Sequence, residues 1–144
     1  MYLISAYFDE NTNKILKHLQ QRIADKTGND FMIRNNVMPH LTISAIEARN
    51  IDVLIPEFEK VCRGKLQPLE EKSVANNTIN IVSLGQLFPR VIYAAPVLNE
   101  YMMNLSISIY NEFATIPETN ISKFYQPYSW MPHITLGKCL DKEQ

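Results

Sequence analysis

The sequence contains few glycines, few cysteines and no long apolar run, and each shortage narrows the functions to be considered. Only four of the 144 residues are glycine, and no glycine-rich loop of the kind that cradles nucleotide phosphates is present. No Gly-x-Ser-x-Gly segment, the nucleophile motif of α/β-hydrolases, occurs either. Nucleotide hydrolases and esterases of these classes are therefore not expected.

The two cysteines, Cys62 and Cys139, lie far apart in the sequence and belong to no Cys-x-x-Cys pair. We expect them to be ordinary thiols, as is typical of a cytosolic protein. No apolar stretch reaches membrane-spanning length, and the N-terminal residues lack the basic start and the cleavage site of a signal peptide. These features predict a cytoplasmic protein with no membrane partner.

Charge is also nearly balanced, since 14 Lys and Arg face 15 Asp and Glu, for a formal net charge of −1. The sequence has no basic tract, so we expect no extended surface for long nucleic acid. Any recognition of phosphate must then be local. With 46% hydrophobic residues, the chain can form one compact domain, or two small lobes that share a core. We expect a single domain and a monomer.

Apolar periodicity predicts strands and helices along the whole chain. We expect strands at 2–8, 40–46, 65–75, 78–84, 90–97 and 133–138. We expect helices at 11–26, at 52–63, and from 98 to just before Pro117. The first strand is predicted to be largely buried, and strands 65–75 and 78–84 are predicted to form a hairpin around Asn76-Asn77.

Two segments, 2–46 and 90–138, repeat one plan of strand, helix, loop and strand. In each segment the loop ends in a proline that opens the same short motif, Pro39-His40-Leu41-Thr42 in the first and Pro132-His133-Ile134-Thr135 in the second. The histidines lie 93 residues apart (133 − 40 = 93), and so do the threonines (135 − 42 = 93). This shared offset indicates a duplicated plan.

The two motifs carry side chains suited to chemistry at phosphorus. On a strand, alternate residues share a face, so His40 should project with Thr42, and His133 with Thr135. One His-x-Thr on a strand is usually incidental, but two copies at matching points of a duplication favour a function. Two imidazoles can act as base and acid in an in-line displacement, while the hydroxyls donate to non-bridging oxygens. This scheme needs no metal, and the sequence shows no metal-type ligand spacing.

The extended motifs, Pro39-His40-Leu41-Thr42-Ile43 and Pro132-His133-Ile134-Thr135-Leu136, resemble the paired His-x-Thr signatures of the two-histidine (2H) phosphoesterase superfamily. The resemblance covers essentially the whole chain, including the order and separation of the motifs. It implies a bilobal α+β fold in which antiparallel sheets flank a central cleft and two pseudo-symmetric lobes each supply one motif.

The same resemblance implies a cofactor-free phosphodiesterase that acts on 2′,3′-cyclic phosphate or 2′-5′ phosphodiester bonds of RNA ends or small nucleotides. Reversible 2′-5′ RNA ligase activity without ATP is part of this expectation. Carried over to the matching positions, the signatures make His40 and His133 the acid–base pair, and Thr42 and Thr135 the donors to the phosphate oxygens.

Two aromatic residues in the loop before the second motif, Tyr128 and Trp130, are candidates for substrate binding. A ring near His133 can stack on a nucleobase whatever the identity of the base. The alternative is that these rings pack the loop onto the body of the protein.

Two basic residues are further candidates. Arg34, in the loop before His40, can pair with a substrate phosphate, or it can be a solvated surface charge. Lys138 follows His133 by five residues, where members of the superfamily commonly carry a basic residue that meets the substrate. Strict alternation would turn Lys138 away from the His133 face, so this role requires a twist or a bulge in the strand.

Two other functions are compatible with the sequence. One is a nucleotide-binding module without turnover, although the intact His-x-Thr pairs argue against it. The other is a hydrolase of cyclic-dinucleotide or oligoadenylate signals, which the near-neutral charge and the aromatic loop allow as readily as RNA. Product analysis across these substrates distinguishes the three.

Overall fold

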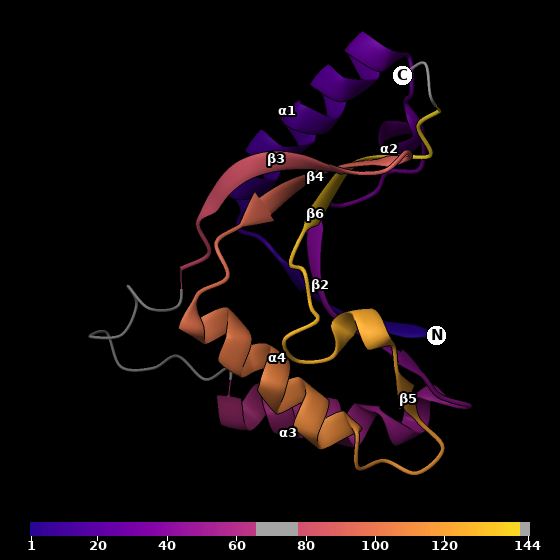
Figure 1. Ribbon diagram of the computed structural model, residues 1–144, viewed down its shortest axis with the longest axis vertical. Coiled ribbons are helices and arrows are strands. Elements are labelled where there is room, and N and C mark those ends of the chain that lie inside the picture. Colours follow the sequence, from indigo (N-terminus) through magenta and orange to yellow (C-terminus); the bar gives the residue numbers. More distant parts are fainter. Residues whose placement is uncertain (66–77, 142–144) are drawn as a thin grey trace. The chain divides into compact units, whose positions relative to one another are not determined.

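The computed structural model describes residues 1–65 and 78–141. In chain order its elements are β1 (Tyr2–Tyr7), α1 (Glu10–Thr27), α2 (Phe31–Arg34), β2 (His40–Glu47), a 3-10 turn (Ile51–Val53), α3 (Ile55–Lys65), β3 (Ile81–Leu87), β4 (Val91–Pro96), α4 (Glu100–Phe113), β5 (Asn120–Ile121), a second 3-10 turn (Lys123–Tyr125) and β6 (Ile134–Lys138) (Figure 1). The predicted α+β class is confirmed. In the described ranges no helix is both long and apolar enough to cross a membrane.

Most predicted elements appear within a few residues of their expected bounds. The expected strand at 65–75 and its Asn76-Asn77 turn lie outside the described residues, except that Lys65 is the last residue of α3. The loop predicted before the first motif contains the one-turn helix α2, and the loop before the second contains β5. Pro56 is the second residue of α3, where its missing N–H breaks no helical hydrogen bond.

The strands are arranged in the order β1-β2-β6-β4-β3, and β5 pairs with β2 outside this path. The β2–β6, β4–β6, β3–β4 and β2–β5 pairs are antiparallel. β1 lies at an edge of the sheet, and the prediction that it is largely buried is wrong, because Leu3 and Tyr7 are exposed. An edge strand lacks the second neighbour that would cover such side chains.

The described residues fall into two compact units. Unit 1 is drawn from Met1–Ile4, Thr42–Asn80 and Val97–Met131, and unit 2 from Ser5–Leu41, Ile81–Pro96 and Pro132–Gln144. Each unit therefore takes residues from both of the repeated segments, 2–46 and 90–138. Strands β1 and β2 contribute to both units.

In unit 2, helix α1 packs against β6 (Figure 1). Asp9 caps the helix by accepting hydrogen bonds from the backbone N–H groups of Asn11 and Thr12, at 2.9 and 3.0 Å. The hydrogen bonds from Thr12 hold the pKa of the Asp9 carboxyl below its ordinary value. Gly28 ends the helix at a φ of 70°, a left-handed conformation that glycine adopts without steric cost.

One face of the sheet in unit 2 is apolar, and α1 packs against it at β6, while Leu84 on the edge strand β3 is 63% exposed. Leu84 of β3 and Leu136 of β6 line a hollow together with Leu19 and Ile23 of the helix. Ile134 lies on this face because its partner on β4, Ala94, is also the partner of Leu84. Ile134 has 0% exposure, so this face forms the core of the unit and leaves the opposite face for other roles.

In unit 1, helices α3 and α4 lie side by side (Figure 1). Lys60 of α3 contacts Glu112 of α4 at 2.6 Å and Glu57 of its own helix at 3.3 Å. Both carboxylates favour the charged ammonium and raise the pKa of Lys60. Val61 of α3 and Ile109 of α4 are buried.

Candidate active site

The two motifs are brought together by the pairing of β2 with β6, in which Leu41 is the partner of Ile134. Because the strands are antiparallel, one step along each strand sets His40 opposite Thr135. Leu41 and Ile134 are both buried on the α1 side, so His40 and Thr135 project from the opposite face. His133 comes immediately before β6, two residues from Thr135. Unit 2 thus gathers three of the four predicted catalytic residues.

Thr42, the fourth predicted residue, follows Leu41 in β2 and belongs to unit 1. Strand alternation sets it on the same side of β2 as His40. Its carbonyl accepts a hydrogen bond from the indole N–H of Trp130 at 3.1 Å. Trp130 is only 6% exposed, so it offers no open face to a nucleobase, and its hydrogen bond ties the loop to the backbone of β2.

A row of residues crosses the sheet at the level of His40. Thr135 is the partner of Tyr93 in β4, and Tyr93 is the partner of Gly85 in β3. At the other end of the row, the ring of Tyr7 in β1 lies with its centroid 6.0 Å from that of His40. The row therefore holds, from β3 to β1, one glycine, two tyrosines, one threonine and one histidine, all within unit 2.

Each histidine of the repeated motif lies beside a tyrosine, and the two tyrosines differ in their surroundings. Tyr7, beside His40, is 66% exposed. Tyr93 is half-buried, and its ring meets that of His133 edge-on, with the centroids 5.7 Å apart and an interplanar angle of 68°. Neither tyrosine was predicted from the sequence. Their positions in the repeat could have indicated them, because Tyr7 lies in the first strand of segment 2–46 and Tyr93 in the first strand of segment 90–138.

A backbone contact determines which ring nitrogen of His40 carries the proton. His40 Nδ1 lies 2.8 Å from the carbonyl oxygen of Met38. A carbonyl oxygen only accepts hydrogen bonds, so Nδ1 carries the proton and donates it. In the neutral ring the lone pair is then on Nε2, which makes Nε2 the nitrogen that can take a proton from a substrate or a water molecule.

Lys138 shares the face of Thr135 because β6 contains a bulge. The register of β6 against β4 shifts by one residue at Leu136. Beyond the shift, Lys138 is the partner of Val91, which lies two residues from Tyr93 and on the same face of β4. Tyr93 is in turn the partner of Thr135. The bulge that a substrate role for Lys138 requires is therefore present, and the side chain is exposed.

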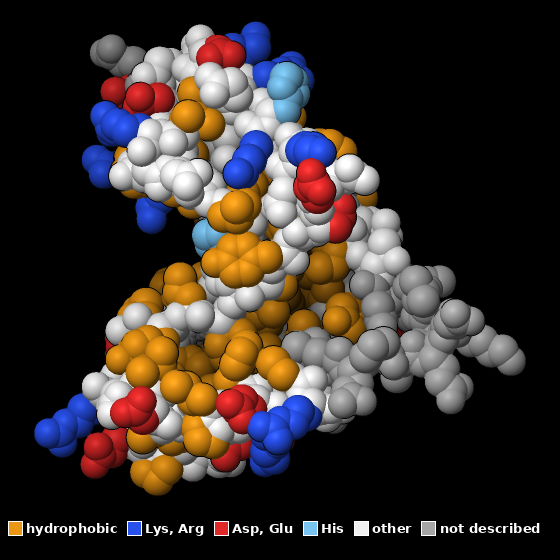
Figure 2. All heavy atoms as spheres, turned by 180° about the vertical axis from the view of Figure 1, so that it is seen from behind, with side chains coloured by type: hydrophobic (Ala, Val, Ile, Leu, Met, Phe, Trp, Pro, Cys, Tyr) orange, Lys and Arg blue, Asp and Glu red, His pale blue; other side chains and the backbone are white. Residues whose placement is uncertain are grey.

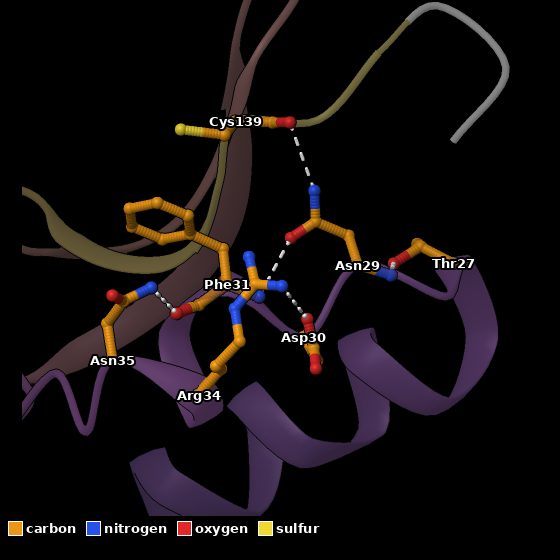
Figure 3. Close-up of polar contacts among 7 residues, drawn as sticks. All are labelled: Thr27, Asn29, Asp30, Phe31, Arg34, Asn35 and Cys139. Atoms are coloured by element: carbon orange, nitrogen blue, oxygen red, sulfur yellow. Dashed lines mark hydrogen bonds and ion pairs between the residues drawn. The ribbon is translucent and has the colours of Figure 1, made fainter.

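Arg34 is the last residue of α2 and lies in a surface network (Figure 3). Its guanidinium is 3.8 Å from the carboxylate of Asp30, and both side chains are exposed. In the same network, the side-chain amide of Asn29 donates to the carbonyl of Cys139 at 3.0 Å, which ties the segment before α2 to the residue after β6. Arg34 is thus already in a weak exposed ion pair, and phosphate binding by it stays a prediction.

Tyr128 lies in unit 1 and is 83% exposed. Its φ of 66° is uncommon for a residue other than glycine. The ring is open to solvent, as a stacking platform must be, and a contact with a substrate stays a prediction.

The described residues contain no group of three or more His, Cys, Asp or Glu that could hold a metal ion. Cys62 and Cys139 are free thiols, as predicted. On the face seen in Figure 2, basic and acidic side chains are interspersed over the surface of the unit that contains α1. Comparison of the sequence with protein-family models and with curated proteins finds no match.

Proposed function

We propose that this protein is a phosphodiesterase that uses two histidines to act on 2′,3′-cyclic phosphate or 2′-5′ phosphodiester bonds of RNA ends or nucleotides, with reversible 2′-5′ ligation as its second direction. One observation carries the proposal. His40 faces Thr135 across paired strands, with His133 two residues from Thr135, and these residues come from a motif repeated at a constant offset. The resemblance to the 2H phosphoesterases suggests which reaction these side chains catalyse.

In the hydrolytic direction, one imidazole accepts a proton from water as the water oxygen bonds to phosphorus. The other imidazole gives a proton to the ribose oxygen that leaves. The products are a phosphate monoester and a free ribose hydroxyl. In ligation, a 5′-hydroxyl takes the place of water and attacks the cyclic phosphate. The bond between phosphorus and the 3′ oxygen breaks, the 3′ oxygen takes a proton, and a 2′-5′ bond remains. His40 takes part through Nε2, because Nδ1 is held by the Met38 carbonyl.

The groups around the histidines then stabilise the charge on phosphorus. The Thr135 hydroxyl lies opposite His40 and donates to a non-bridging oxygen. By the resemblance, Thr42 has the same role in the first motif. Lys138 adds a positive charge on the Thr135 face. An ammonium that meets a phosphate in this way strengthens binding and does not move protons.

The direct test follows the fate of the phosphate by phosphorus NMR. The purified protein is incubated with nucleoside 2′,3′-cyclic phosphates, 2′-5′ dinucleotides, cyclic dinucleotides and oligoadenylates. We expect turnover of the first two classes, and turnover lowered by about 10²–10⁴-fold or more in a His40→Ala/His133→Ala double variant. Turnover of cyclic dinucleotides or oligoadenylates alone would show a signalling hydrolase instead. Calorimetric binding of nucleotides without any product would show a binding module.

The exposed ring of Tyr7 beside His40 is expected to stack on the nucleobase of the substrate. Base–aromatic stacking contributes about 1–3 kcal/mol, so Tyr7→Ala should raise KM for a nucleoside 2′,3′-cyclic phosphate by roughly 5- to 150-fold. Tyr7→Phe keeps the ring and should match the wild type. An abasic ribose 2′,3′-cyclic phosphate serves as the control, and an equal rise in KM for this substrate would contradict stacking.

Loss of the Lys138 ammonium is expected to weaken substrate binding. A hydrogen bond to a charged group contributes about 1.5–3 kcal/mol, so Lys138→Gln should raise KM on the order of tenfold or more. It should also flatten the dependence of KM on salt concentration. Lys26→Gln is the matched control, because Lys26 lies on α1, which covers the opposite face of the sheet. An equal rise in KM for the two variants would mean that Lys138 contributes only to the overall surface charge.

A further inference from the structure

The row of residues across the sheet includes a glycine whose missing side chain leaves room for another residue. Gly85 lies in β3, at the edge of the sheet beside β4 (Figure 1), and is the partner of Tyr93. A Cβ built on Gly85 would lie 2.5 Å from both Cζ and Oη of Tyr93 and 3.0 Å from Cε2. Carbon atoms do not approach so closely, so the phenol ring occupies the space above the Gly85 backbone.

The same ring also contacts the second histidine. Its centroid lies 5.7 Å from that of His133 in an edge-on contact. Edge-on contacts of this kind have preferred geometry, because the positive edge of one ring meets the electron-rich face of the other. Where the Tyr93 ring lies therefore affects which orientation of the His133 imidazole is favoured.

An aromatic ring that lies over a glycine in a sheet can have a purely structural role, in which the ring covers the glycine backbone. Here the ring has a second contact, and that contact is with a residue of the repeated motif. Alanine at position 85 would push the ring from its place, and the displacement would reach His133 directly through Tyr93. The comparable residue beside His40 is Tyr7, which is exposed and is not among the atoms nearest to any glycine.

We propose that Gly85 and Tyr93 are positioning residues for His133. The lack of a side chain at Gly85 leaves space for the tyrosine ring, and the ring orients the imidazole for proton transfer. For its kinetic part this inference rests on the proposed phosphodiesterase function. Catalysis is sensitive to such placement, since an error of about 1 Å can cost on the order of 10²-fold in rate.

The kinetic experiment measures kcat and KM for a 2′,3′-cyclic nucleotide. Gly85→Ala should lower kcat by roughly 10- to 100-fold with little change in KM. Tyr93→Leu should cause a similar loss, while Tyr93→Phe keeps the ring and should stay near the wild type. If the glycine acts through the ring, adding Gly85→Ala to Tyr93→Leu should change kcat less than twofold, whereas independent sites would add their effects.

Gly64→Ala is the matched control, because a Cβ added at Gly64 in α3 meets nothing within 4 Å. It should leave kcat unchanged. Circular dichroism and thermal unfolding of each variant show whether the fold is kept. A folded Gly85→Ala variant with wild-type kcat would overturn the proposal, and so would additive losses in the double variant.

A second measurement does not depend on activity. The chain has three histidines, so imidazole NMR signals can be assigned from His18→Ala, His40→Ala and His133→Ala. Gly85→Ala and Tyr93→Leu should shift the His133 signal and leave those of His18 and His40 in place. If no substrate is turned over but the His133 signal shifts alone, the proposed function fails and the positioning stands. Unchanged His133 signals, or equal shifts of all three, would refute the positioning itself.

Discussion

His40→Ala and His133→Ala are each expected to lower kcat/KM for nucleoside 2′,3′-cyclic phosphates by about 10²–10⁴-fold, the range that a single general acid or base contributes. In the proposed mechanism one imidazole accepts a proton while the other donates one, so loss of either imidazole should slow the displacement. The double variant should be little worse than the poorer single variant, because residues that act as one unit do not contribute additively.

The matched control for these variants is His18→Ala. His18 lies on α1 and is exposed, and α1 covers the opposite face of the sheet, so its replacement should leave kcat/KM within about twofold of the wild type. Thermal unfolding of the three variants tests whether each is folded. If either motif variant keeps near wild-type rates on every cyclic phosphate, the acid–base pair is assigned wrongly.

Replacement of Thr135 by valine is expected to lower kcat by about 10²–10³-fold, as is typical when one donor to a developing negative charge is removed. Valine keeps the β-branched shape and the preference for a strand, so the substitution removes the hydroxyl and little else. Thr135 lies opposite His40 and is half-buried, a position from which the hydroxyl can reach the same phosphate as the imidazole.

Thr135→Ser is the control for this substitution, because serine keeps the donor and should retain most of kcat. KM should change little in both variants, since the hydrogen bond matters most in the transition state. Equal losses with serine and valine would indicate that the methyl group and its packing matter. A Thr135→Val variant with wild-type kcat would remove Thr135 from the mechanism.

The local elements were largely predictable from sequence, and the reasons are local. Helix α1 follows from apolar residues at spacings of three and four, from the Asp9 cap and from the glycine at position 28. The buried face of the motif strands follows from the alternation of Leu41 with His40 and of Ile134 with Thr135. The prediction for β1 failed because a run of apolar letters does not indicate whether a strand is central or at an edge.

The repeat and its spacing were visible in the amino-acid sequence alone, and they singled out His40 and His133 with their threonines. They did not indicate which residues lie opposite one another. The register of β2 with β6 and of β6 with β4 depends on pairings between distant strands, and it placed Thr135 between His40 and Tyr93. No local pattern encodes that row.

The repeated motif by itself therefore indicates which side chains share a face, because alternation along a strand is a local property of the chain. Tertiary structure alone decided the neighbours of those side chains. The bulge at Leu136 places Lys138 on the same face as Thr135. Tyr7 lies beside His40, and Tyr93 lies beside His133. The lack of a side chain at Gly85 leaves the space that the Tyr93 ring occupies. These relations arise only when strands far apart in sequence pair in one register, and a shift of one residue would turn each side chain to the other face of the sheet.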